Sequence, residues 1–211
     1  VSYVVNDGPR PVSPETQARV EKAIKELGYF PNELARSLTR KQTATIGLMV
    51  PNLKNPVYAE IAESFESVCT ASGYTVMLTG TGRDPAKEQK LAETLRSKQV
   101  DGVVILPSQE PYPFLRVFQQ ANIPMVVLEH DLANTHCIVI DDQYGGRLAM
   151  QHLLSLGHRR IALIQRETLS PHGYLRGVGC REMLEESGMP LDLALVIVGK
   201  PGQAAGYAAM Q

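Results

Sequence analysis

The stretch Thr45-Ile46-Gly47-Leu48-Met49-Val50 decides the fold, because it is the first of several short, nearly continuous apolar runs rich in β-branched residues. Similar runs follow at residues 74–79, 103–106 and 125–128. Without alternating polar residues, such runs predict strands buried on both faces of a sheet. Segments with apolar residues at helical spacing separate the runs, around residues 61–69, 91–95 and 114–118. Strand and helix alternate roughly every 25 residues, which with right-handed crossovers predicts a doubly wound parallel sheet of the α/β class.

The alternation continues toward the C-terminus. A strand at residues 137–140 leads into a helix with apolar residues from 148 to 156, which Gly157 ends. A second run of the same kind then begins, with strands at 161–164 and 195–198 and a helix near 173–187. The pattern therefore predicts a first lobe over residues 44–157 and an incomplete second lobe over residues 158–211.

Residues 1–41 form a separate module with strong helix signals. Ser13 is a suitable N-cap, Pro14 fits the first helical position and Gly28 supplies the stop. Between them an apolar face recurs at helical spacing, formed by Val20, Ala23, Ile24 and Leu27. These signals predict an amphipathic helix over residues 14–27. Residues 1–6 resemble the last turns of another helix, and two such short helices need a third partner to close a core.

A second short helix is predicted after Pro31. Asn32 can cap it, and Leu34 and Leu38 lie four residues apart on one side. The segment is shorter than the roughly 12 to 15 residues that an isolated helix needs in water. We therefore expect it to become helical only when a partner orders it.

Composition and charge narrow the class of protein. The chain has 211 residues, 44% of them apolar and 20% charged, with a net charge of -1, which is typical of a globular protein and not of a disordered or membrane protein. Residues 1–41 contain seven basic and five acidic residues, so a slightly basic module precedes an acidic body. The first residues lack the features of a signal peptide, which makes the cytoplasm the expected location. The three cysteines lie far apart and predict reduced thiols.

Motifs for catalysis or cofactor binding are weak. Residues 80–85 follow a strand and begin like a dinucleotide-binding loop, but Pro85 replaces the third glycine, which favours a polar turn. The five histidines contain no pair at i, i+4 and are interpreted as structural. Asp141 and Asp142 are adjacent, so on a strand they would point to opposite faces and could not form a metal pair. We expect no enzyme activity, no cofactor and no metal.

Polar residues gather where the predicted strands end. In an open parallel sheet, ligands bind beyond the carboxyl ends of the strands. In this chain those ends carry many groups that hydrogen-bond hydroxyls, at residues 52–55, 80–84, 107–109, 129–131, 141–142 and 165–166. Together with Tyr58, Tyr144 and Arg176, they suit a polyhydroxylated ligand such as a sugar. The alternative interpretation is that these residues are helix caps and turn residues.

The order of several motifs resembles one family. Residues 12–20 read Val-Ser-x-x-Thr-x-x-x-Val, and residues 27–38 read Leu-Gly-Tyr-x-Pro-Asn-x-x-Ala-Arg-Ser-Leu. Further on, Asn55-Pro56-Val57-Tyr58 and Gly157-His158-Arg159-Arg160-Ile161 occur at the expected positions. In combination these motifs are similar to those of the lac repressor (LacI/GalR) family of bacterial transcription regulators, over essentially the whole chain.

The resemblance implies a function and a set of DNA-binding positions. Residues 1–41 would be a helix-turn-helix headpiece with a hinge helix at about 32–39, truncated at its start, and the rest a periplasmic-binding-protein-like core truncated at its end. The protein would act as a repressor on double-stranded operator DNA, as a homodimer or homotetramer. Leu38 would be an apolar wedge in the minor groove. The positions carried over to DNA contact are Ser2, Tyr3, Asn6, Asn32, Ala35, Arg36 and Leu38.

The resemblance also implies an effector site in the core, formed by Asn55, Val57, Tyr58, Glu129 and Arg176. The expected effector is a sugar or sugar derivative, with a purine as the alternative. Because headpiece and pocket are both expected to be incomplete, these 211 residues alone are predicted to bind operator and effector weakly. The alternative functions are those of a periplasmic-type sugar-binding protein without DNA binding and of a nucleotide- or sugar-using α/β enzyme.

Overall fold

The computed structural model describes residues 12–29, 42–108, 110–166, 171–199 and 203–211, together with Val4 and Ser37. Its largest feature is a sheet of five parallel strands in the order β2-β1-β3-β4-β5. The strands are β1 (Thr45–Val50), β2 (Thr75–Gly80), β3 (Gly102–Ile105), β4 (Met125–Leu128) and β5 (His136–Ile138). The predicted doubly wound parallel sheet is confirmed, with several strand ends shifted by one or two residues.

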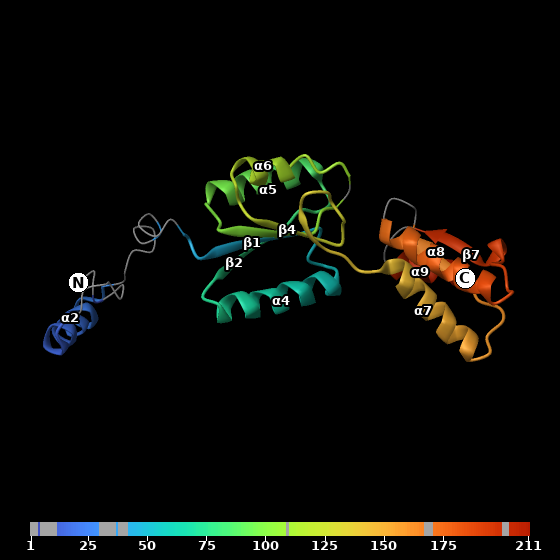
Figure 1. Ribbon diagram of the computed structural model, residues 1–211, viewed down its shortest axis with the longest axis horizontal. Coiled ribbons are helices and arrows are strands. Elements are labelled where there is room, and N and C mark those ends of the chain that lie inside the picture. Colours follow the sequence, from blue (N-terminus) through green and yellow to red (C-terminus); the bar gives the residue numbers. More distant parts are fainter. Residues whose placement is uncertain are drawn as a thin grey trace.

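Helices cover both faces of this sheet. Helix α4 (Pro56–Ala71) lies on one face, and α5 (Pro85–Ser97) and α6 (Leu115–Gln120) lie on the other (Figure 1). Along β1, Met49 is buried against the α5 and α6 side, whereas Leu48 and Val50 are buried against the α4 side. A central strand is therefore apolar at every position, because successive side chains enter the cores on opposite faces of the sheet.

The two edge strands depart from the expected burial. Leu78 on β2 and Ile138 on β5 are exposed large apolar residues. An edge strand has a neighbouring strand on one side only, so the covering helices shield it less completely than a central strand. Burial on both faces was thus a correct prediction for the centre of the sheet and wrong for β2 at its edge.

The second half of the chain forms a smaller α/β unit. Strands β6 (Leu163–Arg166) and β7 (Val196–Gly199) pair in parallel. Around them lie α7 (Asp142–Ser155), α8 (Pro171–Glu186), the short 3₁₀ helix η1 (Leu193–Leu195) and α9 (Gln203–Ala209). We call the five-stranded sheet with its helices the first lobe, and α7 to α9 with β6 and β7 the second lobe.

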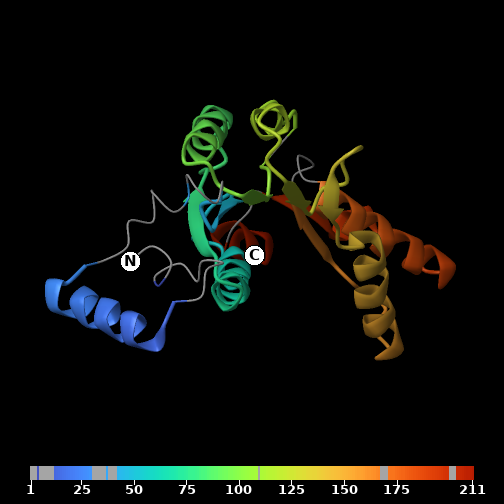
Figure 2. The same cartoon turned by 60° about the vertical axis from the view of Figure 1, so that its left-hand side comes forward.

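Helix α7 packs with α8 and not with the five-stranded sheet. The two helices lie side by side (Figure 2). Met150 on α7 shares a buried core with Cys180 and Leu184 on α8. This packing differs from the expected boundary near Gly157, which assigned the helix to the first lobe. The boundary was placed by the glycine that ends α7, but a helix belongs to the core that buries its apolar face. We therefore propose that the second lobe begins near Asp142.

Near the N-terminus, helix α2 (Pro14–Leu27) has the predicted bounds. The Ser13 hydroxyl accepts a hydrogen bond from the Thr16 N–H at 3.3 Å, and Gly28 adopts a left-handed conformation with φ of 58°. None of its residues is buried, and Leu27 is 81% exposed. The end signals placed both bounds of this helix correctly, because capping is a local interaction.

Across the part of the chain that the structure describes, no helix combines the length and apolar character needed to cross a membrane.

Candidate ligand-binding site

A cavity of about 750 Å³ lies between the two lobes, at the carboxyl ends of the first lobe's strands. All five positions predicted for the effector lie around this one cavity: Asn55, Val57, Tyr58, Glu129 and Arg176. The first four come from the first lobe and Arg176 comes from α8 in the second. Residues more than 100 positions apart therefore meet at one site, as expected for a parallel sheet.

The loop before α4 is held rigidly. The side chain of Asn52 accepts hydrogen bonds from the backbone N–H of Lys54 and of Asn55, at 3.0 and 2.9 Å. Asn55 in turn caps α4 by accepting from the Val57 N–H at 3.2 Å. Asn55 is thus a helix cap, as the alternative interpretation expects, and it also lines the cavity.

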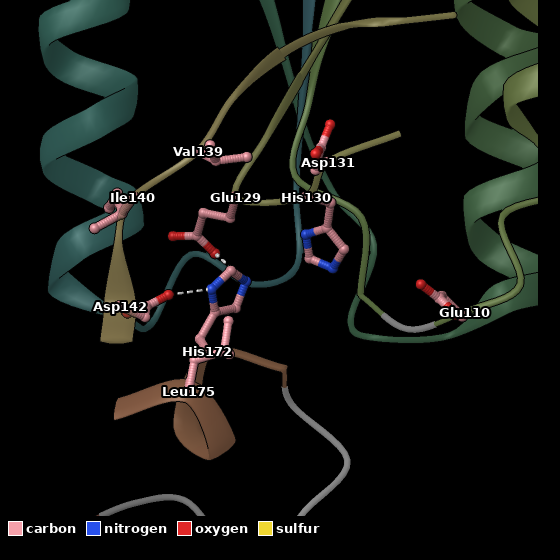
Figure 3. Close-up of a pocket in the computed structure, with 9 residues that line it drawn as sticks. All are labelled: Glu110, Glu129, His130, Asp131, Val139, Ile140, Asp142, His172 and Leu175. Atoms are coloured by element: carbon pink, nitrogen blue, oxygen red, sulfur yellow. Dashed lines mark hydrogen bonds and ion pairs between the residues drawn. The ribbon is translucent and has the colours of Figure 1, made fainter. Parts of the chain in front are cut away.

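Glu129 follows β4 in an uncommon backbone conformation. Its φ is 67°, a left-handed value that residues other than glycine adopt rarely. The Glu129 N–H donates to the carbonyl of Ile138 at 2.8 Å, which anchors the turn to β5. In Figure 3 the Glu129 carboxylate points toward His172 of the second lobe, and its Oε2 lies 4.0 Å from His172 Nε2.

Asp142 links two side chains of α8 at the cavity wall. Its Oδ2 lies 2.5 Å from His172 Nδ1 (Figure 3), and its Oδ1 accepts a hydrogen bond from Arg176 Nε at 2.6 Å. Asp142 is the first residue of α7, where the positive end of the helix dipole favours a carboxylate. Its neighbour Asp141 is the N-cap and accepts from the Tyr144 N–H at 2.8 Å.

Next to this cluster, a smaller cavity of about 330 Å³ is lined partly by His130 and His172. The His130 ring makes edge contacts at 5.3 Å with both Tyr112 and His172. Burial, and next the nearby His172, lower the pKa of His130, while Glu129 opposes that shift. Burial, followed by the charges of Glu110 and Glu88, raises the pKa of Tyr112 to about 12. His130 therefore favours its neutral form.

A buried carboxylate connects two of the loops that follow the strands of the first lobe. Glu88 on α5 is almost fully buried, and its Oε1 accepts hydrogen bonds from both the backbone N–H and the hydroxyl of Ser108, at 3.1 and 2.7 Å. Ser108 follows β3, and its hydroxyl also lies 3.3 Å from that of Thr81, which follows β2. These contacts join the carboxyl ends of two strands, which stabilises the loops that face the cavity.

Several residues of the site differ from the sequence interpretation. His130 and His172 were interpreted as structural, whereas His172 lines both cavities and His130 lines the smaller one. Asp142 was expected on a strand but begins a helix, and its side chain is buried. Tyr144 was expected near the ligand, but it is exposed and is not among the lining residues. The one available signal for His172 was its position four residues before Arg176 on the same helix.

The seven predicted DNA-contacting positions stay predictions. Ser2, Tyr3, Asn6, Asn32, Ala35, Arg36 and Leu38 all lie outside the described residues.

The fold and the interlobe cavity define a two-lobed α/β protein with a cavity between its lobes, and comparison with known families agrees. Residues 43–211 match the family described as periplasmic binding proteins and sugar binding domain of LacI family. Residues 1–32 match the bacterial regulatory proteins, lacI family. The chain belongs to the LacI family, which confirms the resemblance found in the sequence.

Individual relatives are named as transcriptional regulators. The chain is 35% identical over 202 residues to the HTH-type transcriptional regulator DegA of Bacillus subtilis, covering 93% of this chain and 60% of DegA. It is 36% identical over 218 residues to the HTH-type transcriptional repressor PurR of Erwinia tasmaniensis, covering 100% of this chain and 63% of PurR. The chain thus spans about three fifths of the length of these curated relatives.

Solved structures also match. The transcriptional regulator CelR in its cellobiose complex is 33% identical, with a TM-score of 0.69, over 99% of this chain and 64% of CelR. A periplasmic binding protein/LacI transcriptional regulator from Alkaliphilus metalliredigens, complexed with D-xylulofuranose, is 31% identical with a TM-score of 0.65. That match covers 76% of this chain and 59% of the other.

Proposed function

We propose that this protein is a DNA-binding transcriptional regulator, acting as a repressor, whose affinity for operator DNA is controlled by a small-molecule effector. The observation that carries the proposal is the combination, in one chain, of a match to bacterial regulatory proteins at residues 1–32 with a cavity between two lobes. Because the proposed macromolecular ligand is chromosomal DNA, the proposed place of action is the cytoplasm.

The proposed effector is a sugar or sugar derivative. The cavity wall offers carboxylate, amide and guanidinium groups from Glu129, Asn55 and Arg176, which suit hydroxyl groups. Two related structures hold cellobiose and D-xylulofuranose, and a relative from Halalkalibacterium halodurans is named ribose operon repressor. A purine is the alternative effector, and a panel of both ligand classes separates them.

The proposed mechanism couples two sites. An effector that contacts Tyr58 in the first lobe and Arg176 in the second alters the relative position of the lobes. In a homodimer or homotetramer, that change would alter the separation of two hinge segments at about residues 32–39. Each segment is proposed to become helical in the DNA minor groove, with Ala35 and Arg36 facing the groove and Leu38 as the wedge. Ser2, Tyr3, Asn6 and Asn32 complete the proposed DNA contacts.

The decisive experiment measures DNA retention. The immobilised full-length gene product is incubated with sheared genomic DNA of its own organism, and the retained fragments are sequenced at low and at high salt. Enrichment of a few promoter fragments at about 50 mM salt, and their loss at several hundred millimolar, supports the proposal. Protein contacts to DNA phosphates release counterions, so the affinity for DNA falls as the salt concentration rises. Sugar binding without any DNA enrichment would instead favour a binding protein that does not act on DNA.

A further inference from the structure

The Asp142 carboxylate uses both oxygens on side chains of a neighbouring helix. Oδ2 contacts His172 Nδ1 at 2.5 Å, and Oδ1 accepts from Arg176 Nε at 2.6 Å. The side chain of Asp142 is only 2% exposed, whereas those of His172 and Arg176 are 17% and 62% exposed. The arrangement thus has a buried acceptor that receives hydrogen bonds from two more exposed side chains, and both of these side chains line the cavity.

This contact determines which nitrogen of His172 carries hydrogen. A carboxylate oxygen can only accept, so the hydrogen between His172 and Asp142 belongs to Nδ1. In the neutral imidazole, Nε2 is then an acceptor. Among the described residues, His172 Nε2 is buried and has no hydrogen-bond partner, and the nearest carboxylate oxygen, Glu129 Oε2, lies 4.0 Å away.

Asp142 also orients the side chain of Arg176. Its Nε–H donates to Asp142, which fixes the plane of the guanidinium group and leaves the terminal nitrogens for the cavity that Arg176 lines. Because His172 and Arg176 are four residues apart on α8, they lie on the same helix face. One carboxylate from α7 can therefore orient both.

We propose that Asp142 is a positioning residue that sets His172 and Arg176 toward the interlobe cavity and holds the hydrogen of His172 on Nδ1. The inference deepens the proposed function, because it rests on that function for the identity of the cavity as an effector site. It also specifies the chemistry of the site. Glu129 Oε2 and His172 Nε2 are two acceptors 4.0 Å apart from opposite lobes, and a ligand group with O–H or N–H donors that enters between them would satisfy the buried Nε2. Arg176 suits an acceptor on the same ligand.

The first test needs no ligand. Nitrogen-15 NMR at about pH 8, where an ordinary histidine is neutral, reports the tautomer of His172. We expect the Nδ1–H form to predominate, and a slowly exchanging Nε–H signal for Arg176. A predominant Nε2–H form of His172 would overturn the inference, whatever the protein binds.

Asp142→Asn sharpens the test. An amide has one accepting oxygen, so it can serve either the His172 Nδ1–H or the Arg176 Nε–H but not both. We therefore expect at least one of the two NMR signatures to be lost. Either the tautomer of His172 changes or the slowly exchanging Nε–H signal of Arg176 disappears. Retention of both signatures would show that Asp142 does not position these side chains.

Asp141→Asn is the matched control, because asparagine is an equally good N-cap and the change removes the same charge one residue away. Both signatures should persist in it. If Asp142→Asn does not fold, His172→Asn and Arg176→Lys test the same point with Asp142 intact. His172→Asn should leave the slow Nε–H signal of Arg176 unchanged, and Arg176→Lys should leave the Nδ1–H tautomer of His172 unchanged. Loss of the remaining signal in either variant would contradict the inference.

Discussion

The backbone of Gly146 on α7 lies directly against the backbone carbonyl of Arg176 on α8. A Cβ atom added at Gly146 would overlap the Arg176 carbonyl oxygen, and one added at Gly179 would overlap the carbonyl oxygen of Gln143. Neither glycine needs an unusual φ, so the reason for glycine is the close approach of two helices. This approach brings Asp142 within hydrogen-bonding reach of α8, so the close packing of the helices also shapes the cavity wall.

Gly146→Ala should therefore destabilise the second lobe. The clash involves backbone atoms that cannot move aside, so we expect a loss of about 1 to 3 kcal/mol in the free energy of unfolding. Gly145→Ala is the control, because a Cβ there would meet nothing within 4 Å and alanine favours the helix by about 0.5 to 1 kcal/mol. Urea unfolding measures both, and equal stability of the two variants would contradict this account of the packing.

The pH dependence of stability should involve His130. Burial and His172 lower its pKa in the folded state, so as pH falls below about 6.5 the unfolded chain binds the proton first. Stability from the neutral imidazole is therefore complete above that pH and is lost as pH falls toward the folded-state pKa. We expect His130→Gln to lose less stability than the unchanged protein between about pH 7.5 and 5.5. Identical pH slopes in urea unfolding would argue against this role.

The cysteines should differ in reactivity. Burial raises the pKa of Cys180, whose Sγ–H donates to the carbonyl of Gly146 at 3.4 Å, and burial followed by Glu66 raises the pKa of Cys69. Cys137 is only half-buried. Because the thiolate is the reactive form, iodoacetamide should modify Cys137 first in the folded protein. Peptide mass spectrometry with and without denaturant checks this, and rapid modification of Cys180 in the folded state would be the contrary result.

Arg176→Ala should weaken effector binding. Calorimetric titration with cellobiose, D-xylulose, D-ribose and free purine bases first finds which compound binds. Loss of charge-assisted hydrogen bonds should then reduce its affinity by about tenfold or more. Arg181→Ala on the same helix is the control, since Arg181 is exposed and does not line the cavity. An undiminished affinity in Arg176→Ala would remove this residue from the proposed site.

Leu38→Ala should weaken DNA binding and reduce bending, because the proposed apolar wedge would be lost. The probe is a fragment enriched from genomic DNA, and gel mobility with the site at different positions reports both affinity and bend. Gln17→Ala on the exposed surface of α2 is the control. Unchanged affinity and bend angle with Leu38→Ala would end the wedge proposal.

Local signals in the sequence predicted where helices and strands begin and end better than they predicted which elements pack against each other. Ser13 and Gly28 placed both ends of α2, because capping depends on atoms a few residues away. The apolar run at residues 45–50 predicted β1 for a similar reason, as both faces of a central strand are buried. The lobe to which α7 belongs was not predictable from Gly157, since its partner α8 lies about 30 residues further along the chain.

The sequence by itself determined the alternation of strands and helices, the parallel sheet and the edge at which a ligand site should form, because these follow from local periodicity and chain direction. Tertiary structure alone decided that Asp142, His172 and Arg176 form one hydrogen-bonded cluster beside Glu129. These contacts depend on two glycine-lined helices approaching closely and on two lobes meeting across a cavity. No local pattern encodes such an approach, because its geometry depends on residues that are distant in the chain.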